Sequence, residues 1–160
     1  MIRIIFVCHG NICRSPMAEY VFKHLAKQAG VLDHFEVSSA AISTEEIWGG
    51  LGNPIDYRTQ RILRAHGIPF GPGEAHQITA KDFAENDLVI LMDNGNMRGL
   101  RRLLGSCVDD APAGKVSLLL GKAEVSDPWY TGNFEKAYRD IENGCRVLLE
   151  KAARNHYSMR

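Results

Sequence analysis

Several familiar class markers are missing from this sequence. It has no apolar run of the roughly 18 residues that a membrane-spanning helix needs, no internal repeat and no low-complexity tract. Its 4 cysteines form no C-x-x-C pair and no zinc-ligand spacing, and its 19 basic residues are balanced by 19 acidic ones. Because no excess charge favours nucleic acid or an anionic membrane, we expect neither as a partner. We also expect no metal or cofactor.

Signals for secretion are missing as well. The apolar stretch at residues 1–7 is too short for the hydrophobic core of a signal peptide, and no cleavage site follows it. With no disulfide framework either, we expect a reducing, cytoplasmic compartment. A chain of 160 residues can form one core that buries about 70 % of the unfolded surface, so we expect a single domain over residues 1–160. The sequence leaves the oligomeric state open, and we favour a monomer.

What the chain does have is an alternation of apolar strands and amphipathic helices. Strand patterns occupy residues 2–7, 35–40, 88–92 and 115–120, and the first is apolar apart from Arg3, as in strands buried on both faces. Apolar residues at helical spacing follow at residues 17–25, 57–65 and 134–152, with Gly30, Gly67 and Asn133 as end or cap residues. This order predicts an α/β fold with a parallel sheet, which binds ligands beyond the carboxyl ends of its strands.

A short polar loop follows the first strand and begins with a cysteine. Five residues separate Cys8 from Arg14, among them Gly10 and Asn11, which tolerate left-handed backbone conformations. A loop of this kind can curl until its backbone N–H groups point at one tetrahedral anion. The sequence therefore predicts an oxyanion-binding loop directly after strand 1.

The surroundings of Cys8 favour a nucleophile. Ser15 is typical of a helix N-cap and Pro16 of the first helical position, which would direct the positive end of the helix dipole at the loop. A helix N-terminus or an arginine lowers a cysteine pKa from about 8.5 to roughly 3.5 to 7.5, so we expect Cys8 to be a thiolate at neutral pH. Arg14 would bind two oxygens of the anion through its planar guanidinium. The substrate that this loop implies is a phosphate ester.

Hydrolysis through a cysteinyl-phosphate also needs a proton donor on a distant segment, opposite the loop. Asp127 is our candidate, because Pro128 biases it toward an extended backbone. An Asp-Pro pair also opens ordinary turns. The residues alone do not select Asp127 over the other candidate aspartates, which are Asp56, Asp93, Asp109 and Asp110.

Three aromatic residues allow two interpretations each. Trp129 and Tyr130 follow the candidate proton donor, and Trp48 lies among glycines. Each would either line a slot for a flat aromatic ring or anchor its loop to the core.

These motifs resemble one family. Cys8-x5-Arg14-Ser15 after the first strand and the late Asp127-Pro128-Trp129-Tyr130, in a chain of this length, are similar to the landmarks of the low-molecular-weight protein tyrosine phosphatases. Further segments stand in the family's order, namely Gly52-Asn53-Pro54, Asp56-Tyr57-Arg58, His66-Gly67-Ile68-Pro69, Gln77-Ile78-Thr79 and Met92-Asp93. The resemblance covers nearly the whole chain. It implies a four-stranded sheet in the order 2-1-3-4 with helices on both faces, and hydrolysis of phosphotyrosine in a partner protein through a phosphocysteine.

The resemblance also implies roles for residues around the loop. Asn11 and Ser39 would hold the loop in shape, Ser15 would hydrogen-bond the thiolate, and Cys13 would trap an oxidised Cys8 as a disulfide. Phosphate or another oxyanion would occupy the site. Besides Cys8, Arg14 and Asp127, the residues implied in substrate binding are His9, Gly10, Asn11, Ile12, Cys13, Ser15, Trp48, Trp129 and Tyr130. Judged without the family, Ser15 is also compatible with a helix cap, Ser39 with a strand end, Asn11 with a turn, and Cys13 with simple packing beneath the loop.

Two positions bear on this resemblance. The family often carries a loop-supporting histidine shortly before the segment at residues 77–79, whereas here residues 70–75 contain an insertion, and His76 stands where arginine is usual. Ile12 is the bulky aliphatic residue that tyrosine phosphatases carry where relatives acting on phosphoarginine have threonine. Ile12 therefore favours an aryl ester as substrate.

Three other functions fit parts of the pattern. Arsenate reduction on this fold needs two further thiols a few residues apart, and Cys107 has no such neighbour. A phosphate-binding module without turnover has no need of Cys8, Arg14 and Asp127 together. A small redox protein using Cys8 and Cys13 leaves Arg14 and Asp127 unexplained. We therefore predict a metal-independent phosphatase of phosphotyrosine.

Overall fold

A parallel sheet of four strands lies at the centre of the computed structural model, which describes residues 1–158. β1 (Ile2–Cys8) lies between β2 (Phe35–Ala41) and β5 (Leu88–Leu91), and β6 (Val116–Leu118) forms the far edge. All neighbouring strands run parallel. The order β2-β1-β5-β6 confirms the predicted order of the four main strands, although β5 and β6 are shorter than predicted.

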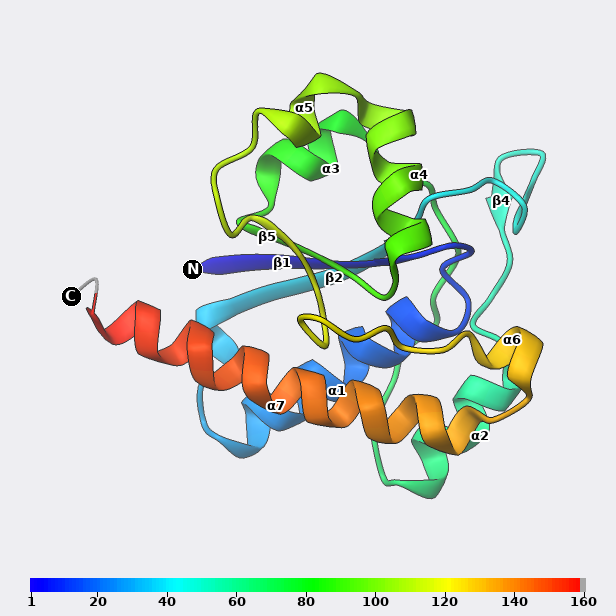
Figure 1. Ribbon diagram of the computed structural model, residues 1–160. Helices are drawn as coiled ribbons and strands as arrows, with labels where there is room; N and C mark the ends of the chain where they lie inside the picture. The colour runs from blue at the N-terminus through cyan, green and yellow to red at the C-terminus, as the bar shows by residue number, and fades with distance from the viewer. Residues whose placement is uncertain (159–160) are drawn as a thin grey trace.

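Helices cover both faces of the sheet (Figure 1). α1 (Arg14–Gln28), α2 (Tyr57–Ala65) and α7 (Phe134–Ser158) lie on one face, and α3 (Ala80–Glu85), α4 (Asn94–Leu104) and α5 (Ser106–Asp109) lie on the other. Along β1, Ile4 and Phe6 pack into the core beneath α1 and α7, whereas Ile5 and Val7 pack into the core on the opposite face. Because successive side chains of a strand point to opposite faces, burial on both sides explains the continuous apolar run.

The ends of the long helices agree only in part with the predictions. α1 has Cys13 as its N-cap residue, with no side-chain cap. The prediction that Ser15 caps this helix is wrong, because its hydroxyl contacts the Cys8 sulfur and the Asn11 amide instead. Gly30 follows the end of α1 with φ 74°, as predicted. The predicted cap of α7 is confirmed, since Asn133 Oδ1 accepts a hydrogen bond from the backbone of the first turn.

A small hairpin, which the sequence analysis does not predict, lies near the loop after β1. β3 (Ile47–Trp48) and β4 (Leu51–Gly52) are joined by Gly49 and Gly50, whose φ values are 57° and 82°. Two successive positive φ angles are what a tight two-residue hairpin turn requires, and glycine adopts them without steric cost.

The carboxyl end of β1 lies at one end of the molecule, and the start of β1 and the end of α7 lie at the other (Figure 1). The loop after β1, the β3–β4 hairpin and the one-turn helix α6 (Pro128–Thr131) come together at the first end. The short 3-10 helix η1 (Leu32–His34) leads into β2. Within residues 1–158, no helix is long and apolar enough to cross a membrane.

Candidate active site

The loop between β1 and α1 turns its carbonyl groups outward. The His9 carbonyl accepts a hydrogen bond from Ser43 N (3.0 Å), and the Ile12 carbonyl accepts one from Asp56 N (2.9 Å). Among the described residues, no protein atom accepts a hydrogen bond from the backbone N–H groups of residues 9–14. These N–H groups are therefore available to an anion held inside the loop, as in other anion-binding nests.

One left-handed residue shapes the loop. Asn11 has φ 59° and is the only non-glycine residue with positive φ in residues 1–158. Its amide Nδ2 donates to Ser15 Oγ (2.8 Å) and to Ser39 Oγ (3.0 Å), and its Oδ1 accepts from His76 N (3.3 Å). Asparagine tolerates this left-handed conformation better than most other non-glycine residues, and the three side-chain contacts hold Asn11 in it.

Ser39 is supported by a residue that the sequence analysis did not consider. Its hydroxyl donates to Glu19 Oε1 (2.7 Å), and the other oxygen of Glu19 accepts from Lys23 Nζ (2.6 Å). The histidine expected from the family is absent from this corner, and a carboxylate from α1 bonds the Ser39 hydroxyl there. The sequence carries only one signal for this role, which is that Glu19 lies one turn after Ser15 on α1.

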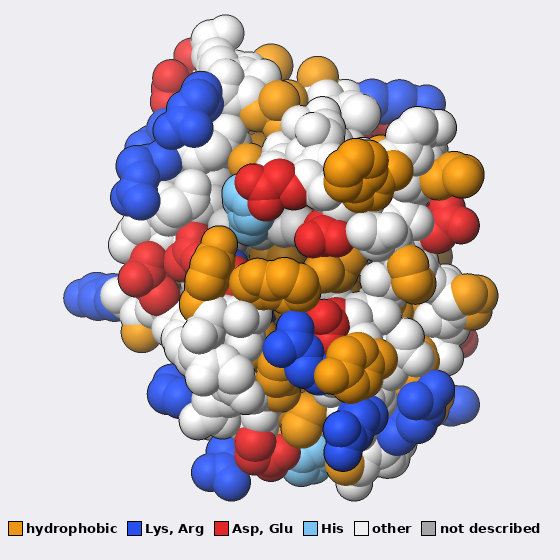
Figure 2. Space-filling view, turned by 90° about the vertical axis from the view of Figure 1, so that its right-hand side faces the viewer, with side chains coloured by type: hydrophobic (Ala, Val, Ile, Leu, Met, Phe, Trp, Pro, Cys, Tyr) orange, Lys and Arg blue, Asp and Glu red, His pale blue; other side chains and the backbone are white. Residues whose placement is uncertain are grey.

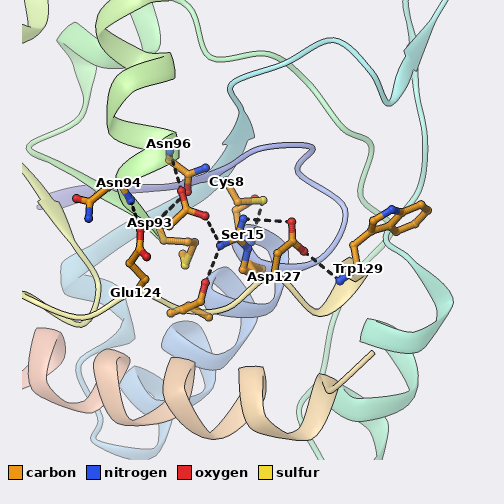
Figure 3. A network of polar contacts seen from close by, with 11 residues as sticks. Cys8, Ser15, Asp93, Asn94, Asn96, Glu124, Asp127 and Trp129 are labelled. Atoms are coloured by element: carbon orange, nitrogen blue, oxygen red, sulfur yellow. Dashed lines mark hydrogen bonds and ion pairs between the residues drawn. The ribbon is translucent and has the colours of Figure 1, made fainter. Parts of the chain in front are cut away.

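Cys8 lies at the bottom of the loop and is only 3 % exposed. Its sulfur lies 3.1 Å from Ser15 Oγ and 3.4 Å from Ser15 N, in the first turn of α1. Figure 3 shows the side chains of both residues pointing toward one another. As a thiolate the sulfur would accept hydrogen bonds from both groups, and charge-assisted hydrogen bonds are roughly twice as strong as neutral ones.

Arg14 is almost completely buried, at 2 % exposure. Its Nη1 donates to Asp93 Oδ2 (2.8 Å) and to the Val125 carbonyl (2.7 Å), and its Nη2 lies 3.4 Å from Asp127 Oδ2. Burial alone lowers the pKa of Arg14, but the negative charges of Cys8, Asp127 and Asp93 outweigh burial and raise the pKa above its ordinary value. The guanidinium therefore stays charged.

Asp93 fixes the direction of that guanidinium. It is the N-cap residue of α4, and its Oδ1 accepts from Asn96 N (2.7 Å) while its Oδ2 faces Arg14. From the sequence, Asp93 is an alternative proton donor and part of the Met92-Asp93 segment of the family resemblance. The pattern Asp93-x-x-Asn96 could have placed it at a helix start, but its contact with a residue 79 positions away had no signal in the sequence.

Asp127 also contacts Arg14, from a different segment. It has an extended backbone, as predicted, and caps α6 by accepting from Trp129 N (3.0 Å) through Oδ1. Its Oδ2 is left to face Arg14. The two interpretations of Asp127-Pro128, a turn opening and a carboxylate at the site, therefore both apply.

One cavity collects most of the predicted residues. Besides Cys8, Arg14 and Asp127, its lining consists of His9, Gly10, Ile12, Cys13, Glu45, Glu46, Trp129 and Tyr130. Figure 2 shows hydrophobic and acidic side chains gathered around a hollow on this end of the molecule. Trp48 does not line the cavity and is 72 % exposed on β3. Asn11, Ser15 and Ser39 do not line it either. Ser15 and Ser39 instead accept hydrogen bonds from the Asn11 side chain, which lies within the loop.

Two acidic residues at the rim were not predicted. Glu45 Oε2 lies 3.0 Å from His9 Nε2, and Glu46 Oε2 accepts from Asn53 Nδ2 (2.7 Å). Gly10 does not need a positive φ here, but a Cβ at that position would lie 3.2 Å from Glu46 Cγ. Gly10 therefore allows a close approach rather than a special backbone conformation.

The remaining cysteines and His66 lie in ordinary surroundings. Burial, followed by the charge of Asp56, raises the pKa of Cys13 to about 12, so it is a thiol at neutral pH. Cys145 is fully buried on α7, and Cys107 is exposed. His66 caps the end of α2, where its ring stacks on Tyr138 and contacts Glu135, as expected for a structural residue.

Comparison with known proteins identifies the family. Residues 3–158 match the family model of the low molecular weight phosphotyrosine protein phosphatases. The human enzyme of that name is 41 % identical over 157 residues, which cover 93 % of this chain and 94 % of the human one. The chain belongs to the low molecular weight protein tyrosine phosphatase family. It is therefore a hydrolase of phosphotyrosine esters, and the reaction of this family passes through a cysteinyl-phosphate.

Solved structures agree with this assignment. The low molecular weight phosphatase YfkJ of Bacillus subtilis is 40 % identical over 160 residues. Its crystal structure matches with a TM-score of 0.86, covering 97 % of this chain and 96 % of YfkJ. The Drosophila arginine phosphatase DARP matches with a TM-score of 0.80 at 30 % identity, covering 93 % of this chain and 96 % of DARP. The family fold therefore serves more than one phosphorylated side chain.

Proposed function

We propose that Cys8, Arg14 and Asp127 carry out the phosphatase reaction in this chain. The Cys8 sulfur attacks phosphorus, an S–P bond forms, and the P–O bond to the tyrosine ring breaks while Asp127 gives the leaving oxygen a proton. Asp127 then takes a proton from water, whose oxygen attacks phosphorus and breaks the S–P bond. Arg14 and the N–H groups of the loop stabilise the equatorial oxygens in both steps, without a metal ion.

The observation that carries this proposal is the position of Arg14. Its guanidinium is buried beside the Asp127 carboxylate, in the cavity whose floor is Cys8. A buried, charged arginine that lines the cavity beside a nucleophile can bind an anionic substrate there. A purely structural role would not explain why Arg14 lines an open cavity.

We propose a phosphotyrosine-containing protein as the partner, with inorganic phosphate and other oxyanions as smaller ligands of the same site. Ile12 lines the cavity as a bulky aliphatic side chain beside Trp129 and Tyr130. Such walls suit a flat ring. The phosphate of phosphoserine lies on a shorter side chain and would reach the Cys8 loop less readily.

The compartment and oligomeric state are part of the same proposal. All 4 cysteines are free, which fits a reducing, cytoplasmic location. We also propose a monomer, because a single chain brings Cys8, Arg14 and Asp127 together in one cavity. Cys13 lines the same cavity as Cys8, which supports a role in trapping oxidised Cys8 as a reversible disulfide.

The proposal is tested by phosphate release in the presence of a chelator. We expect the wild-type protein to release phosphate from a phosphotyrosine peptide, and much less from matched phosphoserine and phosphoarginine peptides. Cys8→Ser should lose about 10⁴-fold or more in kcat/KM, because a serine hydroxyl is not ionised at neutral pH, while still binding phosphate in a calorimetric titration. Turnover near the wild-type rate in Cys8→Ser would rule out the covalent role of Cys8.

A further inference from the structure

The segment that carries Asp127 is short and largely exposed. α6 has only 4 residues, and within it Trp129 is 51 % exposed and Tyr130 is 81 % exposed. A single helical turn has little stability of its own, so its position depends on contacts with the rest of the molecule. Arg14 supplies one such contact, through the Val125 carbonyl and the Asp127 carboxylate.

A second contact comes from Arg58, in the first turn of α2. Its guanidinium carbon lies 5.2 Å from the centre of the Trp129 ring and 4.7 Å from the centre of the Phe134 ring. Both distances are within the range of favourable cation–π contacts, which are worth about 0.5 to 1 kcal/mol at exposed sites. Trp129 lies in α6 and Phe134 begins α7, so Arg58 contacts the chain on both sides of Gly132, where α6 ends.

The orientation of Arg58 is in turn fixed by Asp56. Nε and Nη2 of Arg58 donate to Asp56 Oδ1 and Oδ2, each at 3.1 Å, in the bidentate geometry that arginine favours with carboxylates. The backbone N–H of Asp56 donates to the carbonyl of Ile12 (2.9 Å), inside the loop that holds the phosphate. An unbroken series of contacts therefore leads from the Cys8 loop through Asp56 and Arg58 to α6.

We infer that Arg58 is a positioning residue for the proton donor Asp127, joining α6 to the loop that carries Cys8. This inference rests on the proposed role of Asp127 as the general acid. Arg58 does not line the cavity and does not touch the substrate. Its effect is on the distance between the Asp127 carboxyl and the leaving oxygen, and an error of about 1 Å in such a distance can cost about 10²-fold in rate.

The expected effect of Arg58 depends on the leaving group. An acidic phenol leaves without much help, whereas a weakly acidic phenol needs the proton of Asp127. In Arg58→Ala we expect kcat/KM to fall about tenfold for phenyl phosphate but only about twofold for p-nitrophenyl phosphate. We use kcat/KM because it reports the step in which the phenol departs. Arg58→Lys keeps the charge but not the bidentate fork, so its losses should be intermediate.

Two controls separate this role from a general loss of structure. Arg61 lies one turn further along α2 and is exposed, and Arg61→Ala should change neither substrate by more than about twofold. In an Asp127→Asn background, Arg58→Ala should add almost nothing, because the group that it positions has already been removed. Equal losses for both substrates in Arg58→Ala, or losses that simply multiply with those of Asp127→Asn, would overturn the inference.

A second measurement does not depend on catalysis. The backbone N–H groups of Tyr130, Thr131 and Gly132 bond within α6, so their hydrogen exchange should be faster in Arg58→Ala than in the wild type or in Arg61→Ala. Unchanged exchange would overturn the contact between Arg58 and α6 even in an active enzyme. A wild-type protein without activity on either aryl phosphate would instead overturn the proposed catalytic roles, and the exchange result would still decide whether Arg58 holds α6.

Discussion

The two sides of the active-site cavity are built differently. The Cys8 loop is enclosed, and Cys8, Arg14 and Ser15 are each at most 3 % exposed. The α6 side is an exposed single turn, held by Arg14 and by the cation–π contacts of Arg58. Buried polar networks that are fully satisfied hold their groups in one arrangement. The proposed nucleophile and anion site are thus organised before substrate arrives, whereas the proposed proton donor depends on one contact with buried Arg14 and on cation–π contacts at the surface.

This difference leads to distinct expectations for mutations on each side. Changes on the loop side should affect all substrates alike, because every substrate presents the same phosphate to the same N–H groups. Changes on the α6 side should depend on how much help the leaving group needs. Substitutions on either side therefore test whether the two sides differ in this way.

On the α6 side, the largest effect is expected for Asp127→Ala. Loss of the general acid should lower kcat/KM for phenyl phosphate by about 10² to 10⁴-fold, and less for p-nitrophenyl phosphate. Steady-state kinetics with both substrates checks this. A loss below about tenfold for phenyl phosphate would remove Asp127 from the role. An equal loss for both would mean that its ion contact with Arg14 matters more than its proton.

Glu19→Ala tests the back of the loop. It leaves the Ser39 hydroxyl without its acceptor and Lys23 without its partner, at a cost of about 1 to 3 kcal/mol in the free energy of unfolding. We expect a lower melting temperature and a loss of about tenfold in kcat/KM that is the same for both aryl phosphates. Glu19→Gln keeps an acceptor for Ser39 and should stay within about threefold of the wild type.

The control for Glu19→Ala is Glu85→Ala. Glu85 also lies four residues from a lysine, Lys81, but both side chains are exposed on α3. Glu85→Ala should leave both the melting temperature and the kinetics unchanged. A Glu19→Ala protein with the same kinetics as Glu85→Ala would show that the loop keeps its shape without this carboxylate.

The two tryptophans near the site should behave differently. Trp129 lines the cavity, so Trp129→Ala should raise KM for a phosphotyrosine peptide by about three- to tenfold. Trp48 does not line it, and Trp48→Ala should change KM by less than about twofold. Peptide kinetics on both variants checks this. The reverse order would place the ring of the substrate against the β3–β4 hairpin instead.

The raised pKa of Cys13 predicts that the folded protein loses stability at alkaline pH. Because burial raises its pKa to about 12 in the folded protein, the unfolded chain loses this proton first. The contribution of Cys13 to the free energy of unfolding is fully present below pH of about 9. It is lost as pH rises toward 12, by up to about 1.4 kcal/mol per pH unit. Urea unfolding at pH 8 and pH 10 should show a steeper loss for the wild type than for Cys13→Ala. Parallel losses in the two proteins would argue against a proton held on buried Cys13.

Local patterns in the sequence were sufficient for much of this account. The apolar run of β1, the spacing from Cys8 to Arg14 and the Asp127-Pro128 pair are each contiguous, and their positions follow from rules about strands, loops and prolines. The strand order and most roles came from the family resemblance rather than from the residues. Gly49-Gly50 is a recognisable signal for a hairpin turn, although no hairpin was predicted from it.

Contacts between distant segments were not predictable in this way. Asp93 and Glu19 act through Arg14 and Ser39, which lie on other elements, and no spacing rule links them. The Ser15 prediction failed for a related reason: the sequence pattern of a helix cap is the same whether the hydroxyl bonds the helix backbone or the Cys8 sulfur. Trp48 and Trp129 likewise allow the same two interpretations from the sequence, and only the fold separates them.

The most direct test of this account is to find the covalent intermediate. The Asp127→Ala protein, which should be slow in the water-activating step, would be mixed with p-nitrophenyl phosphate, quenched in acid within milliseconds and digested for mass spectrometry. We predict one phosphoryl group, on the peptide that carries Cys8, and none in Cys8→Ser. Turnover by a protein that never carries phosphate on Cys8, or that carries it on another residue, would contradict the central claim.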